Sequence, residues 1–245
     1  MERVKIKGVD KMDKVLGIIG GMGPLSAVKL FERIVLLTDA NCDQEHLRIF
    51  IDNNTSVPDR TDYILGKIID DPRGQLIQSA QKLQSIGADY LVICCNTAHY
   101  FYEDLVRSVD IPILNMIEEA AKYILEEYNG IKNIGLLSTE GTSKVLVYDN
   151  MFNKYGLNII KPSVENQQHI TNVIYNIKKG IPNEDLSGFY KAMEDIKSKG
   201  ANIFITGCTE LSLAIDLYKL EGDFINPLEL LAIKAIEYSG KSVIK

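Results

Sequence analysis

The sequence contains GADYLVICCNT at residues 87–97 and, on the same plan, GANIFITGCTE at residues 200–210. Each stretch opens with Gly-Ala, continues through an aliphatic run and ends with a cysteine among polar side chains. A second pair, VLGIIGGMG at residues 15–23 and NIGLLSTEG at residues 133–141, shares two glycines at equivalent positions. Because the glycines and the cysteine recur in the same order, the pattern predicts an internal repeat.

Short aliphatic and β-branched runs alternate along the chain with longer segments of helical period. In residues 75–86, for example, Leu76, Ala80 and Leu83 form part of a one-sided apolar stripe. Continuously apolar strands separated by helices are typical of parallel sheets covered on both faces, which is the α/β class. The predicted strands are residues 15–19, 47–52, 90–94, 111–114, 134–137, 158–160, 203–206 and 224–225, and the predicted helices are 25–38, 72–86, 101–108, 117–128, 142–155, 167–179, 185–199 and 227–239.

The repeat and this alternation together predict an α/β protein of two pseudo-symmetric lobes. Each lobe is expected to be a parallel sheet flanked by helices, with the active site in the cleft between the lobes. A chain of 245 residues, 46% of them hydrophobic, can bury cores of this size. We expect one lobe to comprise residues 1–116 plus 226–245, with the last helix returning to it, and the other to comprise residues 117–225.

Composition and charge exclude several classes of function. The 27 Lys+Arg and 33 Asp+Glu residues give a net charge of −6 without a basic block, which argues against a nucleic-acid surface. No apolar run reaches the ~18 residues of a membrane helix. The run at residues 15–28 imitates a signal peptide, but its glycines and Pro24 would break the required helix. We therefore expect a soluble cytoplasmic protein with reduced thiols and no nucleic-acid or membrane partner.

Two of the four cysteines occupy equivalent positions in the repeat. Cys95 and Cys208 each follow a predicted strand and precede polar residues. Ligands of parallel sheets bind beyond the carboxyl ends of the strands, so both thiols are expected to face one cleft from opposite sides. Each is also expected at a helix N-terminus, where the dipole and free N–H groups favour a thiolate. Cys42 and Cys94 are expected to be packing residues.

Two thiols across a cleft could have three uses. A disulfide is disfavoured by a reducing compartment and by the lack of a C-x-x-C motif. A metal site that also uses His99 is disfavoured, because zinc needs four ligands and the chain has three histidines. In the third use, a thiolate removes a proton from one face of a carbon and a thiol returns one to the other face. That reaction inverts a stereocentre, and it needs two equivalent groups placed pseudo-symmetrically.

The GGMGP turn at residues 20–24 follows a predicted strand and precedes a predicted helix, as a dinucleotide-binding fingerprint would. The fingerprint fails, because G-x-G-x-x-G starting at Gly21 needs a glycine where the chain has Ser26. The turn, which includes Met22, can still present backbone N–H groups to a carboxylate.

Taken together, the motifs resemble those of the pyridoxal-phosphate-independent aspartate racemase family, within the aspartate/glutamate racemase superfamily. The segments that carry the resemblance are GGMGP at 20–24, Asn53-Asn54 with PDRT at 58–61, CNTAH at 95–99, Gly141-Thr142, and GCTE at 207–210. The PDRT segment and Glu210 favour the aspartate branch, since glutamate racemases usually carry histidine at that place. The resemblance implies an enzyme that interconverts L- and D-aspartate, with glutamate as a further candidate substrate, by a two-base mechanism without a cofactor, commonly as a homodimer.

The resemblance also implies roles for individual residues. It makes Cys95 and Cys208 the catalytic bases, and it implies no metal site. The expected substrate-binding residues are Met22, Arg60, Asn96, Thr97, Ala98, Thr139, Thr142, Lys178, Thr209 and Glu210. The alignment of Lys178 needs a one-residue gap, so Lys179 remains an alternative.

Several of these residues also have structural interpretations. Arg60 could form a surface ion pair with Asp59 or Asp62, Thr139 and Thr142 could cap a helix, and Glu210 could be a first-turn acid. His99 is expected to be structural. The alternative functions are a thiol-dependent isomerase or decarboxylase of another small dicarboxylate, or a small-molecule-binding module. The side-chain preference, the physiological direction and the dimer surface stay open.

Overall fold

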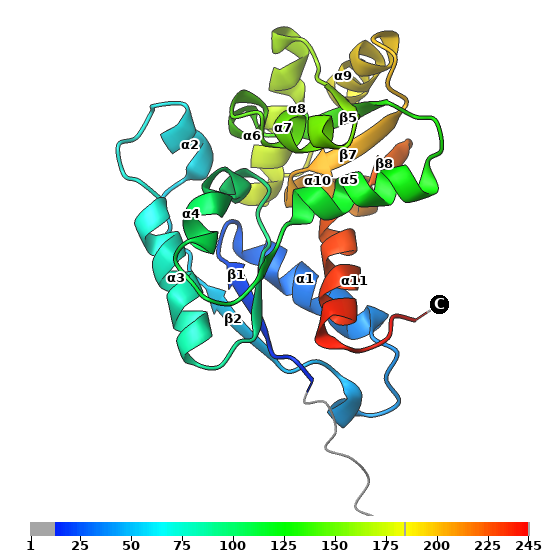
Figure 1. Ribbon diagram of the computed structural model, residues 1–245. Coiled ribbons are helices and arrows are strands. Elements are labelled where there is room, and N and C mark those ends of the chain that lie inside the picture. The colour runs from blue at the N-terminus through cyan, green and yellow to red at the C-terminus, as the bar shows by residue number, and fades with distance from the viewer. Residues whose placement is uncertain (1–12, 184, 245) are drawn as a thin grey trace, which may run out of the picture.

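The computed structural model describes residues 13–183 and 185–244, which form two four-stranded sheets with helices around them (Figure 1). Residues 1–12 and Lys245, which the lobe prediction includes, lie outside the described residues. The first sheet contains β1 (Leu16–Gly20), β2 (Ile49–Asn53), β3 (Tyr90–Ile93) and β4 (Ile113–Leu114), and the second contains β5 (Asn133–Ser138), β6 (Asn158–Ile160), β7 (Ile203–Gly207) and β8 (Asp223–Ile225). The first sheet lies in the lower half of Figure 1 and the second in the upper half.

Both sheets have the same topology. The strand order is β2-β1-β3-β4 in the first sheet and β6-β5-β7-β8 in the second, and every neighbouring pair is parallel. The α/β class and the two pseudo-symmetric parallel sheets predicted from the repeat are therefore confirmed. All eight predicted strands overlap an observed strand.

Helices cover both faces of each sheet, so the four core clusters are one per face. In the first half of the chain they are α1 (Pro24–Leu37), α2 (Arg60–Ile64), α3 (Arg73–Ser85), α4 (Tyr102–Val106) and α5 (Met116–Glu127), with 3₁₀ helices η1 (Asp43–Glu45) and η2 (Thr97–Phe101). In the second half they are α6 (Glu140–Lys144), α7 (Val147–Lys154), α8 (Val164–Lys179), α9 (Ser187–Ser198), α10 (Thr209–Tyr218) and α11 (Pro227–Ser239).

The C-terminal helix α11 lies beside α1 (Figure 1). Its residues Leu231, Ala235 and Ile236 belong to the same core cluster as Leu16 and Ile18 of β1. This packing supports the proposal that α11 completes the first lobe, with the lobe boundaries near residues 116 and 226.

The repeated glycines have the same physical cause in both sheets. A Cβ on Gly17 would lie 2.5 Å from the Leu91 side chain, which is its register partner on β3. A Cβ on Gly135 would lie 2.7 Å from Phe204, its register partner on β7. In each sheet a large residue on the neighbouring strand occupies the space, so only glycine fits without repacking.

The helix predictions differ from the structure in three places. The predicted helix at 142–155 is two helices, because the chain turns at Leu146, which adopts a left-handed conformation with φ 57° immediately before α7. Helix α2 was not predicted, and no range was predicted for α10, although a helix N-terminus was expected at Cys208. The apolar residues of α10 lie on several of its faces, so it lacks the one-sided stripe that marks an amphipathic helix.

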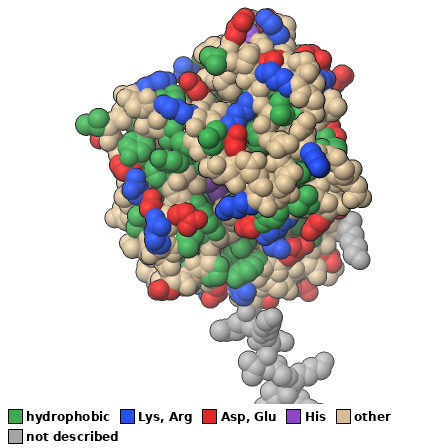
Figure 2. All heavy atoms as spheres, turned by 45° about the horizontal axis from the view of Figure 1, so that its top comes forward, with side chains coloured by type: hydrophobic (Ala, Val, Ile, Leu, Met, Phe, Trp, Pro, Cys, Tyr) green, Lys and Arg blue, Asp and Glu red, His purple; other side chains and the backbone are tan. Residues whose placement is uncertain are grey.

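Within the described residues no helix is long and apolar enough to cross a bilayer. On the face of the molecule in Figure 2, Lys and Arg side chains are interspersed with Asp and Glu. The excess of acidic residues is thus mixed with basic ones on this face.

Candidate active site

The two repeated cysteines meet at one cavity between the sheets, which we call the inter-lobe cavity. Cys95 lies two residues beyond β3, and Cys208 lies between β7 and α10 as the N-cap of that helix. The two residues are 6% and 7% exposed, and both are unpaired thiols. The residues that line the cavity are Met22, Asp59, Arg60, Thr61, Cys95, Asn96, Thr97, Thr139, Lys178, Cys208, Thr209 and Glu210.

Most of the predicted substrate-binding residues therefore lie together, although they come from six segments of the chain. Ala98 and Thr142 are fully buried and do not line the cavity. Asp59 and Thr61 line it but were not predicted, although both belong to the PDRT segment that carried part of the resemblance. Lys178 lines the cavity and Lys179 does not, which favours Lys178.

The inter-lobe cavity is nearly closed. Its volume is about 10 Å³, which is the space of about one water molecule. A chamber of about 240 Å³ adjoins it and shares four of its residues, Asp59, Arg60, Lys178 and Glu210. The other walls of the chamber include Leu25, Ile177 and Leu213. The chamber therefore lies directly beside the cavity that holds the two thiols.

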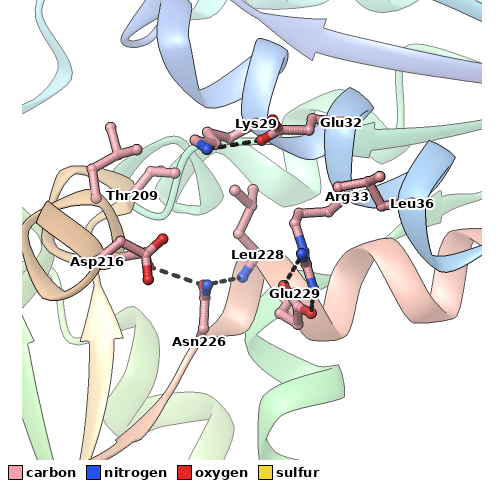
Figure 3. Close-up of a pocket in the computed structure, with 11 residues that line it drawn as sticks. Lys29, Glu32, Arg33, Leu36, Thr209, Asp216, Asn226, Leu228 and Glu229 are labelled. Atoms are coloured by element: carbon pink, nitrogen blue, oxygen red, sulfur yellow. Dashed lines mark hydrogen bonds and ion pairs between the residues drawn. The ribbon is translucent and has the colours of Figure 1, made fainter. Parts of the chain in front are cut away.

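A separate cavity of about 360 Å³ lies between α1, α10 and α11 (Figure 3). Its lining residues include no cysteine, and four of its five charged side chains are paired with one another. Lys29 bonds Glu32, and Arg33 of α1 forms a bidentate ion pair with Glu229 of α11. This cavity therefore offers no thiol to a ligand.

Burial and the neighbouring Glu210 both act on the pKa of Cys208. The Cys208 thiol donates a hydrogen bond to Glu210 Oε2 at 2.8 Å. Burial raises the pKa of Cys208 well above its usual value, and the negative charge of Glu210 raises it further, while Lys178 acts in the opposite direction. The sequence-based expectation of a thiolate at this helix N-terminus is therefore wrong for Cys208, because burial and Glu210 outweigh the helix dipole.

Lys178 supplies positive charge to the cavity. Burial lowers the pKa of its ammonium, but Cys208, Glu210 and Cys95 raise it by more, so the net pKa lies above its usual value. Its Nζ also lies 5.1 Å from the ring centroid of Tyr175. Although Lys178 is exposed as a residue, its ammonium is held charged by the groups around the thiols.

The loop after Cys95 is anchored by a neutral histidine. Cys95 is followed by the short 3₁₀ helix η2 and not by the α-helix that the sequence predicted. His99 Nδ1 donates to the Cys95 carbonyl at 2.9 Å, and its Nε2 accepts from the Met116 N–H at 3.3 Å. Burial lowers the pKa of His99 to about 4. Since both ring nitrogens are used within the protein, His99 is structural, as expected.

Arg60 is the first residue of α2 and is only 7% exposed. Its Nη1 donates to the carbonyls of Val57 and Pro58, whereas its buried Nε has no hydrogen-bond partner among the described residues. Neither Asp59 nor Asp62 forms an ion pair with it, because Asp59 instead caps α2 by accepting from the Asp62 N–H at 2.9 Å. Arg60 thus presents an unpaired, charged donor at the cavity.

A cluster of threonine hydroxyls joins the two halves of the molecule next to the thiols. Thr97 Oγ1 lies 3.2 Å from Thr139 Oγ1 and 2.8 Å from Thr142 Oγ1, and Thr61 Oγ1 donates to Thr139 at 3.3 Å. Thr139 also caps α6 by accepting from the Thr142 N–H, as one interpretation of the sequence expected. Thr142 therefore acts on the site only through its neighbours.

Two repeated glycines allow the halves to approach. A Cβ on Gly23 would lie 3.1 Å from Glu210 Oε1, and a Cβ on Gly141 would lie 2.8 Å from Thr61 Oγ1. Each glycine thus faces a residue of the other half. The recurrence of these glycines reflects contact between the halves, whereas that of Gly17 and Gly135 reflects packing within a sheet.

Of the two cysteines expected to be packing residues, only one is buried. Cys94 is fully buried, and its thiol donates to the Ile19 carbonyl at 3.3 Å, so it is a packing residue. Cys42 is exposed at the N-cap position of the short helix η1, so its assignment to packing was wrong. The sequence around Cys42 does not indicate that this side chain is exposed whereas that of Cys94 is buried. Within residues 13–183 and 185–244 no three His, Cys, Asp or Glu side chains gather so as to hold a metal ion.

Comparison with known proteins agrees with this architecture. The family model described as Asp/Glu/Hydantoin racemase matches residues 19–231. The chain is similar to the broad specificity amino-acid racemase RacX of Bacillus subtilis, with 27% identity over 89% of this chain and 95% of the relative. It is also similar to the solved aspartate racemase of Picrophilus torridus, with 29% identity, a TM-score of 0.76, and coverage of 95% of this chain and 96% of that one. A glutamate racemase of Clostridium botulinum is 27% identical over 86% of this chain and 77% of its own length. The chain therefore belongs to the Asp/Glu/hydantoin racemase family.

Proposed function

We propose that the protein interconverts L- and D-aspartate by a two-base mechanism in which Cys95 and Cys208 are the bases, with glutamate as a second substrate to be tested. One observation carries the proposal: two buried thiols from equivalent strand ends of a repeat line the same small cavity. Racemisation requires acid–base groups on opposite faces of one carbon, and a pseudo-symmetric pair meets that need. The similarity to solved aspartate racemase supports aspartate as the first substrate to test.

In the proposed reaction one thiolate takes the α-proton and the opposite thiol delivers its own proton to the other face. Because burial and Glu210 raise the pKa of Cys208, this thiol is assigned as the proton donor in one direction, with Cys95 as the opposing base. The number of protons on the pair is unchanged by one turnover, and the two cysteines exchange roles for the reverse reaction.

Binding of the two substrate carboxylates is assigned to the positive groups at the cavity. Arg60 carries the unpaired buried Nε, and Lys178 carries an ammonium whose pKa is raised. The Asn96-Thr97 and Thr209 segments can donate hydrogen bonds to the α-carboxylate, where charge develops as the proton leaves. These donors lie in a nearly closed cavity with room for about one water molecule, so they compete with little solvent for the substrate.

The test is incubation of the purified protein with L- and D-aspartate in D₂O, followed by chiral chromatography and NMR of the α-proton. We expect both enantiomers to racemise with exchange of the α-proton. Cys95→Ala and Cys208→Ala are each expected to abolish racemisation, while the exposed Cys42→Ala serves as the matched control and keeps full activity. Full activity in either of the first two variants would refute the two-base scheme.

A substrate panel separates the alternatives. Glutamate and other amino acids establish the specificity, since RacX is named for broad specificity. Maleate and malonate test the isomerase and decarboxylase alternatives. Turnover of either acid without racemisation of any amino acid would replace the proposal, and binding without turnover would favour a binding module. Because the reaction needs reduced thiols, the proposed place of action is the cytoplasm.

We further propose that the protein is a homodimer that pairs through α1. The outer face of this helix carries five large apolar residues that are 37% to 58% exposed: Leu25, Val28, Phe31, Val35 and Leu36. A two-fold axis would place this stripe of one copy against the same stripe of the other. A second copy of the chain is therefore the occupant that suits this exposed apolar stripe.

Light scattering with size-exclusion chromatography tests the dimer. We expect the wild type to be a dimer at micromolar concentration and Val28→Glu to be a monomer with an unchanged circular dichroism spectrum. Ile69→Glu is the matched control, because Ile69 is also exposed but lies in the loop between α2 and α3. A monomeric wild type, or a Val28→Glu variant that remains dimeric, contradicts this pairing.

A further inference from the structure

A buried tyrosine connects the two halves of the molecule at the inter-lobe cavity. Tyr148 lies on α7, is fully buried, and donates a hydrogen bond from Oη to Asn96 Oδ1 at 2.5 Å. Asn96 follows β3 of the first sheet and lines the cavity next to Cys95. The two residues are 52 positions apart in the chain, so this bond exists only when the halves are packed together.

The bond fixes the orientation of the Asn96 amide. A buried hydroxyl needs an acceptor, and Asn96 Oδ1 is the acceptor that the Tyr148 hydroxyl has in the described part of the chain. With the amide turned over, its NH₂ group would face the tyrosine oxygen and the hydroxyl proton would have no acceptor. Burial also raises the pKa of Tyr148, so the hydroxyl stays protonated.

Holding Oδ1 towards the tyrosine leaves the other end of the amide free. Among the described residues Asn96 Nδ2 has no hydrogen-bond acceptor. The atom is also not fully buried, so a ligand can reach it. Because Asn96 lines the cavity, this NH₂ group is available to a ligand there. A neutral donor of this kind can bind a carboxylate oxygen without adding charge beside the thiols.

We propose that Tyr148 is a positioning residue that orients Asn96, so that Asn96 Nδ2 donates to a carboxylate oxygen of the substrate. The inference rests on the proposed function for the identity of the substrate. It also means that a donor carried by one lobe is oriented by the other, which links closure of the lobes to substrate binding. Tyr148 itself touches no substrate.

The first test compares Tyr148→Phe with Tyr155→Phe. Tyr155 is a suitable control because it follows the same helix and donates to Glu118 Oε1 at 2.6 Å, outside the cavity lining. Loss of an oriented donor is expected to lower kcat/KM for aspartate about tenfold in Tyr148→Phe, mainly through a higher KM. Tyr155→Phe is expected to stay within about twofold of the wild type. Equal kinetic effects in the two variants would overturn the proposal.

A double-mutant cycle shows whether Tyr148 acts through Asn96. Asn96→Ala removes the donor, so Tyr148→Phe added to it is expected to cause no further loss of kcat/KM. A further loss of the same size as in the wild-type background would mean that Tyr148 acts by another route, and the proposal fails.

A second variant keeps the proposal testable if Tyr148→Phe does not fold. Asn96→Asp retains an acceptor for Tyr148 but replaces the donor by a negative charge, so KM for aspartate is expected to rise more than tenfold. A wild-type KM in this variant overturns the proposal. Calorimetric titration with aspartate distinguishes failure of the Tyr148 proposal from failure of the proposed function. If the wild type binds aspartate without racemising it, the proposed function fails and the affinities of the variants still decide the role of Tyr148; if it binds no amino acid, both proposals fail.

Discussion

Acidification is expected to destabilise the protein through His99. This ring is 5% exposed, and both of its nitrogens are committed: Nδ1 donates to the Cys95 carbonyl, and Nε2 accepts from the Met116 N–H. A carbonyl can only accept and an amide N–H can only donate, so these partners require the neutral tautomer with the proton on Nδ1. Protonation of Nε2 would place two donors against each other in a buried site.

The magnitude follows from the depressed pKa. The folded protein lowers the pKa of His99 from 6.5 to about 4, mainly through burial. The unfolded chain therefore binds the proton first, so the stability contributed by the neutral ring is present above pH 6.5 and is lost as the pH falls towards 4. Linkage gives a loss of about 2 kcal/mol between pH 7 and pH 5 and roughly 3 kcal/mol by pH 4.

The assay is urea unfolding followed by circular dichroism at pH 7, 6 and 5, for the wild type and for His99→Asn. Asparagine can still donate to the Cys95 carbonyl but does not titrate. It leaves the Met116 N–H unpaired, which costs about 1–3 kcal/mol at every pH. Because carboxylates also contribute to acid sensitivity, the difference between the two proteins is the diagnostic quantity.

We expect the wild type to lose about 2 kcal/mol more than the variant between pH 7 and pH 5. An NMR titration of the ring in the folded wild type provides an independent measurement, with a midpoint near pH 4 expected. Parallel stability curves, or a midpoint near 6.5, would refute the reasoning.

The other predictions concern Cys208 and the contact between the halves. Glu210→Gln removes the charge that raises the pKa of Cys208, so alkylation of Cys208 by iodoacetamide should shift to lower pH; an unchanged profile would contradict this role of Glu210. Gly141→Ala places a Cβ 2.9 Å from the backbone Cα of Thr61 and is expected to cost about 1–3 kcal/mol in thermal unfolding and to reduce activity. The control Gly74→Ala, in α3 with no atom within 4 Å of the new Cβ, should instead stabilise by about 0.5–1 kcal/mol, and the reverse ranking of the two variants would be inconsistent with this packing.

The local pattern of apolar residues, glycines and cysteines was sufficient to predict the strands and to recognise the two repeats. Strand hydrophobicity and helical period are properties of neighbouring residues, so the eight strands and most helices could be predicted from them. The glycines recur in the repeat because the two sheets pack alike. Only glycine leaves room for Leu91 beside Gly17 and for Phe204 beside Gly135. The extent of helix α10 could not be predicted because its apolar residues lie on several faces, so it lacks a single apolar stripe.

The sequence by itself determined the α/β class, the two equivalent parallel sheets and the meeting of two cysteines beyond their strand ends, because chain order and the geometry of parallel sheets are enough to place strand ends. Tertiary structure alone decided the charge state of Cys208 beside Glu210, the burial of Arg60, the exposure of Cys42 and the bond from Tyr148 to Asn96. Each of these depends on burial or on contacts between side chains that only the packed halves create, and neither quantity is encoded in the local pattern of residues.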